Sequence, residues 1–214
     1  MDLDALPYVV VDVETTGGQP SGPDRVTEVA AVHVDGAEIR LAFHSLVNPE
    51  RPIPCAITRL TGIDDAMVRD APTFSDLAGE FAVHLVGRVF VAHNARFDLG
   101  FLTAEFARVA PLPLPSLLAG QLCTVRLARR LLAHLPRRNL DAVSHHYGVE
   151  IEGRHRAAGD AMATAHVLRG LLRDAAKRGV HTWEEVEVLL GARTARARRR
   201  RSGLPSWSDG AEGA

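Results

Sequence analysis

The sequence predicts an α/β domain built on a mixed β-sheet. Three strand-like segments come first, at residues 8–13, 26–34 and 38–47, and helical segments then alternate with further short strands. That order favours a single sheet with helices packed against it. The length of 214 residues, with 46% hydrophobic and 24% charged residues, suits one domain of moderate size.

The strand predictions follow from residue type and from turn signals. Residues 8–13 form a continuous β-branched run, which is typical of a buried strand. Residues 17–23 are rich in Gly and Pro and indicate a turn. Asp35-Gly36 lies between the next two strand segments and predicts a hairpin. Residues 48–54, marked by proline, predict a loop.

The central helices are predicted from capping residues and apolar spacing. Thr73 is a plausible N-cap with Asp76 three residues later, and apolar residues recur at helical spacing as far as Leu85. A short strand is expected at residues 88–92. A helix at residues 95–109 is apolar on most faces, which indicates burial.

The second half of the chain is predicted to be mostly helical. We expect a short strand at residues 122–125 followed by helices at residues 126–135, 139–147, 157–178 and 183–190, with Gly179 a natural stop. From residue 192 onward Arg, Gly, Ser and Pro dominate, and we expect disorder. The expected organisation is therefore one domain at residues 1–191 and a basic tail at residues 192–214.

Cysteine content and hydropathy exclude several classes of protein. Cys55 and Cys123 are far apart and form no C-x-x-C pair, so neither a disulfide framework nor a zinc ribbon is indicated. Residues 1–7 do not resemble a signal peptide, and no apolar run approaches the ~20 residues of a membrane helix. We expect a cytoplasmic protein without membrane contact.

Charge is distributed unevenly along the chain. The formal net charge is -1, but residues 193–201 contain six arginines and no acid, so removing those six charges leaves -7 for the rest. An acidic body with a basic arm fits a carboxylate-rich site beside a segment that binds phosphate without sequence preference. The alternative is a solvated tail that only aids solubility.

Two carboxylates lie at the end of the first predicted strand. Asp12 and Glu14 lie two residues apart, so both side chains leave the same face of the strand. Their mutual repulsion would be relieved by a hard cation with oxygen ligands. Thr15, Thr16 and Gly17 follow at once and suit contact with a sugar or phosphate. A lone D-x-E can equally be a solvated strand end.

Two further acids lie near the starts of predicted helices. Asp98 falls in the first turn of the helix at residues 95–109, and Asp160 near the start of the longest helix, five residues after His155. An acid in a first turn can simply complement the helix dipole. It can also point into a site at the end of a strand.

Together these segments resemble the DEDDh exonucleases, the DnaQ-like group that includes proofreading subunits of bacterial DNA polymerase. The three motifs occur in the family's order, as Val-Asp-Val-Glu-Thr-Thr-Gly ending at Gly17, His-Asn-Ala-Arg-Phe-Asp ending at Asp98, and His-Arg-Ala-Ala-Gly-Asp ending at Asp160. Lesser matches include Glu28 and residues 57–63. The spacing of His155 and Asp160 indicates the His-type branch of the family.

The resemblance implies a fold and a mechanism. It implies a ribonuclease H-like α/β fold with a five-stranded mixed sheet flanked by helices. Asp12, Glu14, Asp98 and Asp160 would hold two Mg²⁺ or Mn²⁺ ions, and His155 would be the general base. Oxygen ligands suit these hard cations. The expected activity is 3′→5′ release of 5′ mononucleotides from a free 3′ end, single-stranded DNA being favoured.

The resemblance also implies substrate contacts, which are Thr15 and Thr16 at the terminal nucleotide, Leu60 as a wedge, and His93 and Phe97 in the nucleotide pocket. Leu60 and Phe97 could equally belong to the core. Glu28 would be a supporting residue, and Asn94 could hold a turn or the substrate.

Two alternatives stay open at this point. One is an exoribonuclease of the ribonuclease T or oligoribonuclease type, since the distinction depends on how the pocket meets the 2′-hydroxyl. The other is a non-catalytic nucleic-acid-binding module whose working part is the basic arm. DNA polymerase subunits are candidate partners. No clamp-binding or polymerase-binding peptide is visible in the tail, which favours a stand-alone trimming or repair nuclease over a proofreading subunit.

Overall fold

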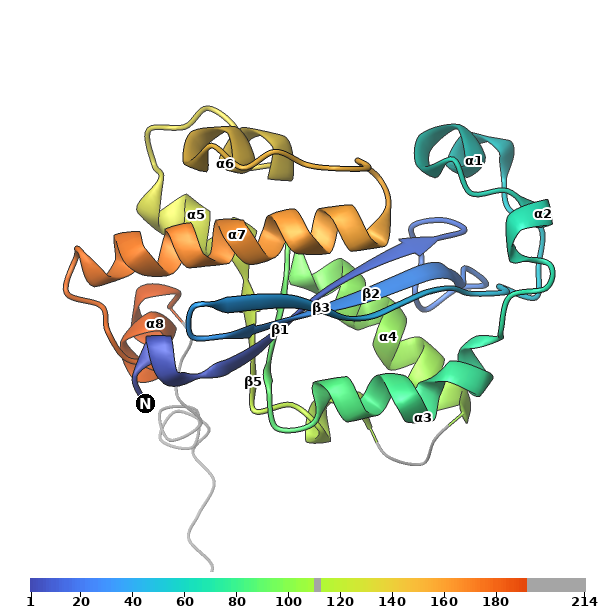
Figure 1. The fold of residues 1–214 in the computed structure, drawn as a ribbon, viewed down its shortest axis with the longest axis horizontal. Helices are drawn as coiled ribbons and strands as arrows, with labels where there is room; N and C mark the ends of the chain where they lie inside the picture. The colour runs from blue at the N-terminus through green and yellow to red at the C-terminus, as the bar shows by residue number, and fades with distance from the viewer. Residues whose placement is uncertain (110–112, 192–214) are drawn as a thin grey trace, which may run out of the picture.

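The computed structural model describes residues 1–109 and 113–191. One five-stranded sheet with the order β3-β2-β1-β4-β5 runs through the described part of the chain (Figure 1). Its strands are β1 (Pro7–Thr15), β2 (Val26–Asp35), β3 (Glu38–Leu46), β4 (Val89–Ala92) and β5 (Gly120–Cys123). The first three strands pair antiparallel, whereas β4 is parallel to both β1 and β5. The predicted five-stranded mixed sheet is confirmed.

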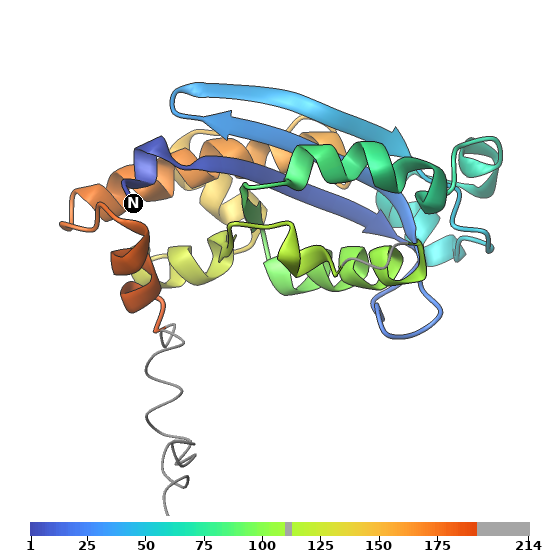
Figure 2. The same cartoon turned by 90° about the horizontal axis from the view of Figure 1, so that it is seen from below.

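Helices cover both faces of this sheet, as Figures 1 and 2 show. One face carries α5 (Thr124–Leu131), α6 (Leu140–Tyr147) and α7 (Ala157–Ala176), while the other carries α3 (Phe74–Leu85) and α4 (Ala95–Val109). A short α8 (Trp183–Leu189) completes the first layer through buried Val186. Side chains of β1 alternate between the two cores: Tyr8 and Val10 pack toward α7, and Val9, Val11 and Val13 toward α4.

Several local predictions agree with the structure. Gly36 adopts the positive φ of 58° that the hairpin after Asp35 requires. Thr73 caps α3 and forms a capping box with Asp76. The helix at residues 95–109 has the predicted bounds.

The boundary between β5 and α5 was predicted too far along the chain. We expected the strand at residues 122–125 and the helix at residues 126–135. Pairing of β5 with β4 instead ends at Cys123, opposite Ala92, and α5 begins at the next residue. It ends at Leu131, where the carbonyl oxygens of Arg130 and Leu131 accept from the Arg178 guanidinium. The carbonyl oxygens of Leu132 and Ala133, just beyond the helix, accept from the Arg138 guanidinium. The long helix likewise ends two residues earlier than expected.

Two helices were not predicted. Helices α1 (Cys55–Thr61) and α2 (Asp65–Val68) lie beyond the end of the sheet at which β1 finishes (Figure 1). α1 follows Pro54 without a side-chain cap, and its seven residues are too few for a periodicity argument to detect. A small separate cluster of Ile53, Ile63 and Val68 holds the pair together.

The predicted basic tail at residues 192–214 lies outside the described residues. Within the part of the chain that the structure describes, none of the helices is both long and apolar enough to span a membrane.

Candidate active site

The carboxyl ends of the parallel strands β1 and β4 meet at one edge of the sheet, and the predicted acids gather there. Asp12 and Glu14 project from the same face of β1 as Tyr8 and Val10, toward α7. A β-bulge between Glu14 and Thr15 bends the strand immediately after the second carboxylate.

Asp98 reaches the same edge from α4. Its carboxylate Oδ1 accepts a hydrogen bond from the Val13 backbone N–H at 3.3 Å, so it is fixed to the residue between Asp12 and Glu14. The turn into α4 passes through Asn94, which has a φ of 79° and whose carbonyl accepts from the Phe97 N–H. Asn tolerates this left-handed conformation better than most residues. Asn94 therefore holds the turn, and it also lines the pocket described below.

Asp160 and His155 enter from the start of α7. Asp160 is 4% exposed, and its Oδ2 accepts from the Arg154 guanidinium and from the His155 N–H at 3.3 Å. His155 has a φ of 61°, which is uncommon for a non-glycine residue and marks a constrained position. Gly159 permits this geometry, because a Cβ on it would lie 1.7 Å from the Glu152 carbonyl oxygen.

Burial and mutual repulsion raise the pKa values of these acids. Burial, followed by the charges of Asp160 and Glu28, raises the pKa of Glu14 to about 7. Burial raises the pKa of Asp98, and burial followed by the charges of Asp98, Glu14 and Asp160 raises the pKa of Asp12 well above its usual range. Each carboxylate thus disfavours ionisation of the others, which a bound cation would reverse.

The donor set fits divalent cations. Glu14, His155 and Asp160 each offer a ligand atom, and these atoms lie within 4.8 Å of one another. Asp160 Oδ1 is buried without a hydrogen-bond partner among the described residues, so it has an unused lone pair inside the site. Carboxylate oxygens suit Mg²⁺ or Mn²⁺, and neither cysteine of the chain belongs to this group.

A buried glutamate supports the loop that carries His155. Glu28 on β2 pairs in register with Glu14 and is 0% exposed. Its carboxylate accepts from the Arg156 guanidinium, from the Ala157 N–H at 2.8 Å and bonds to His44 Nε2 at 2.8 Å. The burial of Glu28 could be read from its apolar strand, but its partners could not.

Arg154 and Arg156 were not singled out from the sequence. The Arg154 guanidinium bridges Asp160 and Asp141, with 2.8 Å between Arg154 Nε and Asp141 Oδ1. The sequence feature that could have identified both arginines is their position on either side of His155, close to the predicted carboxylates. Both arginines balance negative charge at the start of α7.

The predicted substrate residues occupy varied surroundings. The Thr15 hydroxyl donates to the Gly17 carbonyl at 2.6 Å, and the Thr16 hydroxyl accepts from the Arg25 N–H, so both stabilise the loop that follows β1. Leu60 on α1 is 53% exposed. Phe97 is half-buried and packs against Phe101 with ring centroids 4.9 Å apart.

His93 follows β4 and uses both ring nitrogens. Nε2 donates to the Arg138 carbonyl oxygen at 3.0 Å, so Nδ1 accepts from the Thr124 hydroxyl at 2.9 Å. Burial lowers the pKa of His93 to about 4, which keeps the ring neutral. His93 therefore ties the end of β4 to the loop before α6 as well as facing the pocket.

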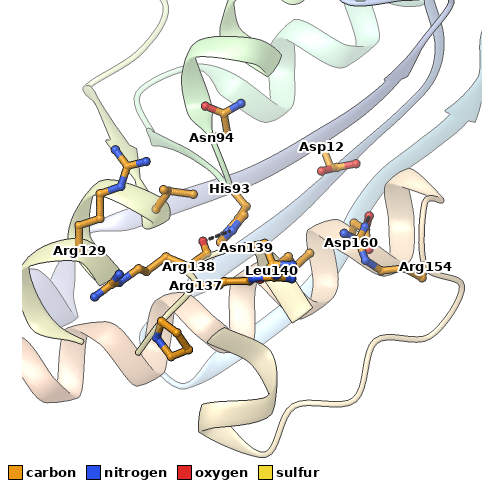
Figure 3. A pocket seen from close by; sticks show the side chains of 12 residues that line it. Asp12, His93, Asn94, Arg129, Arg137, Arg138, Asn139, Leu140, Arg154 and Asp160 are labelled. Carbon is orange, nitrogen blue, oxygen red and sulfur yellow. Dashed lines mark hydrogen bonds and ion pairs between the residues drawn. The ribbon is translucent and has the colours of Figure 1, made fainter. Parts of the chain in front are cut away.

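A pocket of about 620 Å³ opens over this edge of the sheet. Figure 3 shows Asp12 and Asp160 at one end of it and Arg129 and Arg137 at the other. His93 and Asn94 line it between these two groups. The pocket therefore pairs a carboxylate cluster with a cationic wall, as an anionic substrate held beside metal ions requires.

This chain is similar to known proteins over most of its length. Residues 9–168 match the exonuclease family RNase T. The chain is 36% identical over 198 residues to DNA polymerase III PolC-type of Bacillus subtilis, covering 92% of this chain and 14% of that protein. It is 40% identical over 194 residues to a DNA polymerase III subunit epsilon-like protein of Rhodobacter capsulatus, covering 86% of this chain and 26% of that protein. The chain thus spans less than a third of the length of these curated relatives.

A solved structure agrees with these relatives. Exonuclease X in complex with 5′ overhanging duplex DNA is 28% identical, with a TM-score of 0.65 over 86% of this chain and 99% of that one. The resemblance and the ribonuclease H-like fold inferred from the sequence are thereby confirmed. This chain belongs to the exonuclease family, within its DnaQ-like DEDDh group.

Proposed function

We propose that this chain is a metal-dependent 3′→5′ exonuclease that releases 5′ mononucleotides from the 3′ end of DNA. The observation that carries the proposal is the convergence of four carboxylates and His155 on one edge of the sheet. These residues come from β1, α4, α7 and the loop that leads into α7, and Asp98 is hydrogen-bonded to the backbone between Asp12 and Glu14.

Asp12, Glu14, Asp98 and Asp160 are proposed to hold two divalent cations, Mg²⁺ or Mn²⁺. When bound, such ions activate water and offset the charge that develops on the phosphodiester and the leaving oxygen. Supporting this assignment, the raised pKa values of Asp12, Glu14 and Asp98 identify a site with excess negative charge. Arg154 offsets only part of that charge, and bound cations would offset more of it.

His155 is proposed to take the proton of the attacking water. Its backbone N–H donates to Asp160, and one ring nitrogen lies within 4.8 Å of carboxylate oxygens of Glu14 and Asp160. Histidine exchanges a proton near neutral pH, which suits a general base. Water oxygen then bonds to phosphorus as the bond to the leaving 3′ oxygen breaks. A 5′ mononucleotide and a chain shorter by one residue result.

The 3′-terminal nucleotide is proposed to contact Thr15, Thr16, Leu60, His93 and Phe97. The exposure of Leu60 supports its role as a wedge, because a large apolar side chain on a surface helix beyond the end of β1 is free to pack on a base. Since the Thr15 and Thr16 hydroxyls bond within their own loop, backbone groups of that loop are the better candidates for substrate contact.

Single-stranded DNA is the proposed substrate, and DNA polymerase subunits are proposed partners. The names of the Bacillus subtilis and Rhodobacter capsulatus relatives support a link to DNA polymerase III, and the Exonuclease X complex supports DNA as ligand. A cytoplasmic location stays a prediction.

Paired DNA and RNA oligonucleotides of one sequence test the proposal. Each is labelled at its 3′ or 5′ end and incubated with Mg²⁺ or Mn²⁺. We expect the 3′ label to leave first as a mononucleotide and the 5′-labelled chain to shorten stepwise, with DNA preferred. Release of the 5′ label first would contradict the polarity, and a wide preference for RNA would indicate an exoribonuclease.

Matched variants separate catalysis from binding. Asp12→Ala should abolish nucleotide release and leave oligonucleotide binding largely intact, whereas Glu80→Ala, which removes an exposed acid from α3, should change neither. Unchanged cleavage by the Asp12 variant would overturn the catalytic assignment. Binding without release by the unmodified chain would instead support the non-catalytic module.

A further inference from the structure

A second cavity, of about 830 Å³, joins the active-site pocket. It lies between α4 and the β5–α5 segment, and Asn94, Val125 and Arg129 line both cavities. Its wall is largely apolar, formed in part by Leu99, Ala104, Leu122 and Cys123. The second cavity therefore begins where the first one ends, and neither the metal ligands nor His155 line it.

Arginines border this apolar wall. Arg96, Arg126 and Arg129 line the second cavity, and each is exposed. Among the described residues none of the three forms an ion pair, whereas Arg154 and Arg156 near the carboxylates both do. Three unneutralised guanidinium groups on one rim repel one another, and an anionic ligand would offset that repulsion.

Helix α5 adds further positive charge on this side. It buries Leu127 and Leu131 and exposes Arg126, Arg129 and Arg130. The Leu190 carbonyl accepts from the Arg126 guanidinium at 3.0 Å, which leaves the charge of that guanidinium without an acidic partner among the described residues. The exposed face of α5 is therefore cationic.

An apolar wall with a cationic rim suits a strand of nucleic acid. Bases stack or pack on apolar surface irrespective of sequence, and guanidinium groups bind the phosphates between them. A small apolar ligand would leave the arginines unpaired, and a free phosphate would leave the apolar wall bare. Because the second cavity is continuous with the active-site pocket, one strand can occupy both.

We propose that the second cavity binds the nucleotides immediately upstream of the 3′ end, with Arg96 and Arg126 on their phosphates. This inference rests on the proposed function and names how the same strand is held beyond the reacting nucleotide. The enzyme then gains affinity and rate from strand length, through contacts that take no part in the chemistry.

The test compares a dT dinucleotide with a free 5′-hydroxyl, which has no phosphate upstream of the scissile one, with a dT 20-mer. For Arg96→Ala combined with Arg126→Ala, kcat/KM for the 20-mer should fall about 10-fold or more, and kcat/KM for the dinucleotide should stay within about 2-fold of that of the unmodified chain. The slope of log KM against log salt for the 20-mer should also fall, by about 1.4 for two lost single-strand phosphate contacts. Arg40→Ala with Arg173→Ala, which removes the same charge from β3 and α7, should change neither substrate.

A second variant probes the wall itself. Thr103 lines the second cavity and is exposed on α4. Thr103→Glu should weaken use of the 20-mer through charge repulsion, and Thr103→Gln should not. Equal effects of the arginine variant on both substrates, or no effect on either, would overturn the inference.

A measurement of oligonucleotide binding tests the second cavity independently of catalysis. In an Asp12→Asn background, anisotropy with a labelled 20-mer measures the upstream contacts whether or not cleavage occurs. Loss of affinity on Arg96 and Arg126 substitution would support the strand path even if the proposed reaction fails. Unchanged affinity would contradict it even if the reaction is confirmed.

Discussion

The Glu28 carboxylate on β2 is bonded to the Arg156 guanidinium at 2.7 Å while its own strand pairs in register with Glu14. This ion pair joins the sheet to the residue that follows His155, and Glu28 also accepts from the Ala157 N–H at the start of α7. The position of His155 relative to the carboxylates thus depends on Glu28, which is bonded to the two residues that follow His155 and not to His155 itself.

Replacing Glu28 should therefore impair the chemistry more than substrate binding. We expect Glu28→Gln to lower kcat by about 10–100-fold, as losses of supporting contacts around a metal site do, with KM little changed. Steady-state kinetics with a DNA oligonucleotide check this expectation. Glu38→Gln removes an exposed acid from β3 and should leave kcat unchanged.

A double-mutant cycle shows whether Glu28 acts through His155. Residues that act as one unit have non-additive effects. In a His155→Ala background, Glu28→Gln should cause little further loss of kcat. Full additivity of the two losses, or a large drop in melting temperature that accounts for the loss, would show that Glu28 is only structural.

The first turn of α7 should not tolerate a side chain at Gly159. A methyl group there would collide with the Glu152 carbonyl oxygen and displace the loop that leads to His155. We expect Gly159→Ala to cost about 1–3 kcal/mol in the free energy of unfolding and to reduce kcat. Gly79→Ala is the control, because that glycine lies in α3 with nothing within 4 Å of the added methyl.

Gly79→Ala should raise stability by about 0.5–1 kcal/mol, because alanine loses less backbone entropy than glycine in a helix. Chemical denaturation measures both variants. Equal effects at the two glycines would show that the contact with Glu152 is not a constraint.

The metal-free protein should lose stability as pH rises through neutrality. Because the pKa of Glu14 is about 7 in the fold and about 4.3 in the unfolded chain, the folded state binds the proton more tightly. The resulting stabilisation is complete below pH 4 and is lost as pH rises through 7. Asp12 and Asp98, whose pKa values are also raised, act in the same direction.

Glu14→Gln should reduce this pH dependence. In EDTA at pH 8 we expect the variant to be more stable than the unmodified chain by an amount on the order of 2 kcal/mol. Denaturation curves from pH 5 to 8 measure it. Adding Mn²⁺ at pH 8 should stabilise the unmodified chain more than the variant, and identical pH profiles in EDTA would contradict the crowding of the carboxylates.

Much of the fold can be predicted from sequence signals that act within a few residues. The β-branched run of β1, the Asp35-Gly36 turn and the Thr73 capping box each act within a few residues, so each could be predicted. Helix α1 could not, since it has no side-chain cap and only seven residues. The last carbonyl oxygens of α5 accept from Arg178, a contact with a distant segment that the sequence of the helix does not indicate.

The candidate site divides in the same way. Asp12 and Glu14 share a strand face by simple alternation, and the motif order associates Asp98 and Asp160 with them. The bonds of Glu28 to Arg156 and of Arg154 to Asp141 join segments far apart in sequence or outside the motifs, and only the folded chain brings them together. The same is true of His93, whose ring nitrogens both find partners in the β5–α6 region.

The central claim is that four carboxylates gather around divalent cations, and anomalous diffraction from crystals soaked in Mn²⁺ tests it most directly. We predict two manganese peaks within ligand distance of Asp12, Glu14, Asp98 and Asp160, both absent from crystals of the Asp12→Asn variant. Manganese bound only elsewhere on the protein, or an empty site at saturating Mn²⁺, would contradict the account.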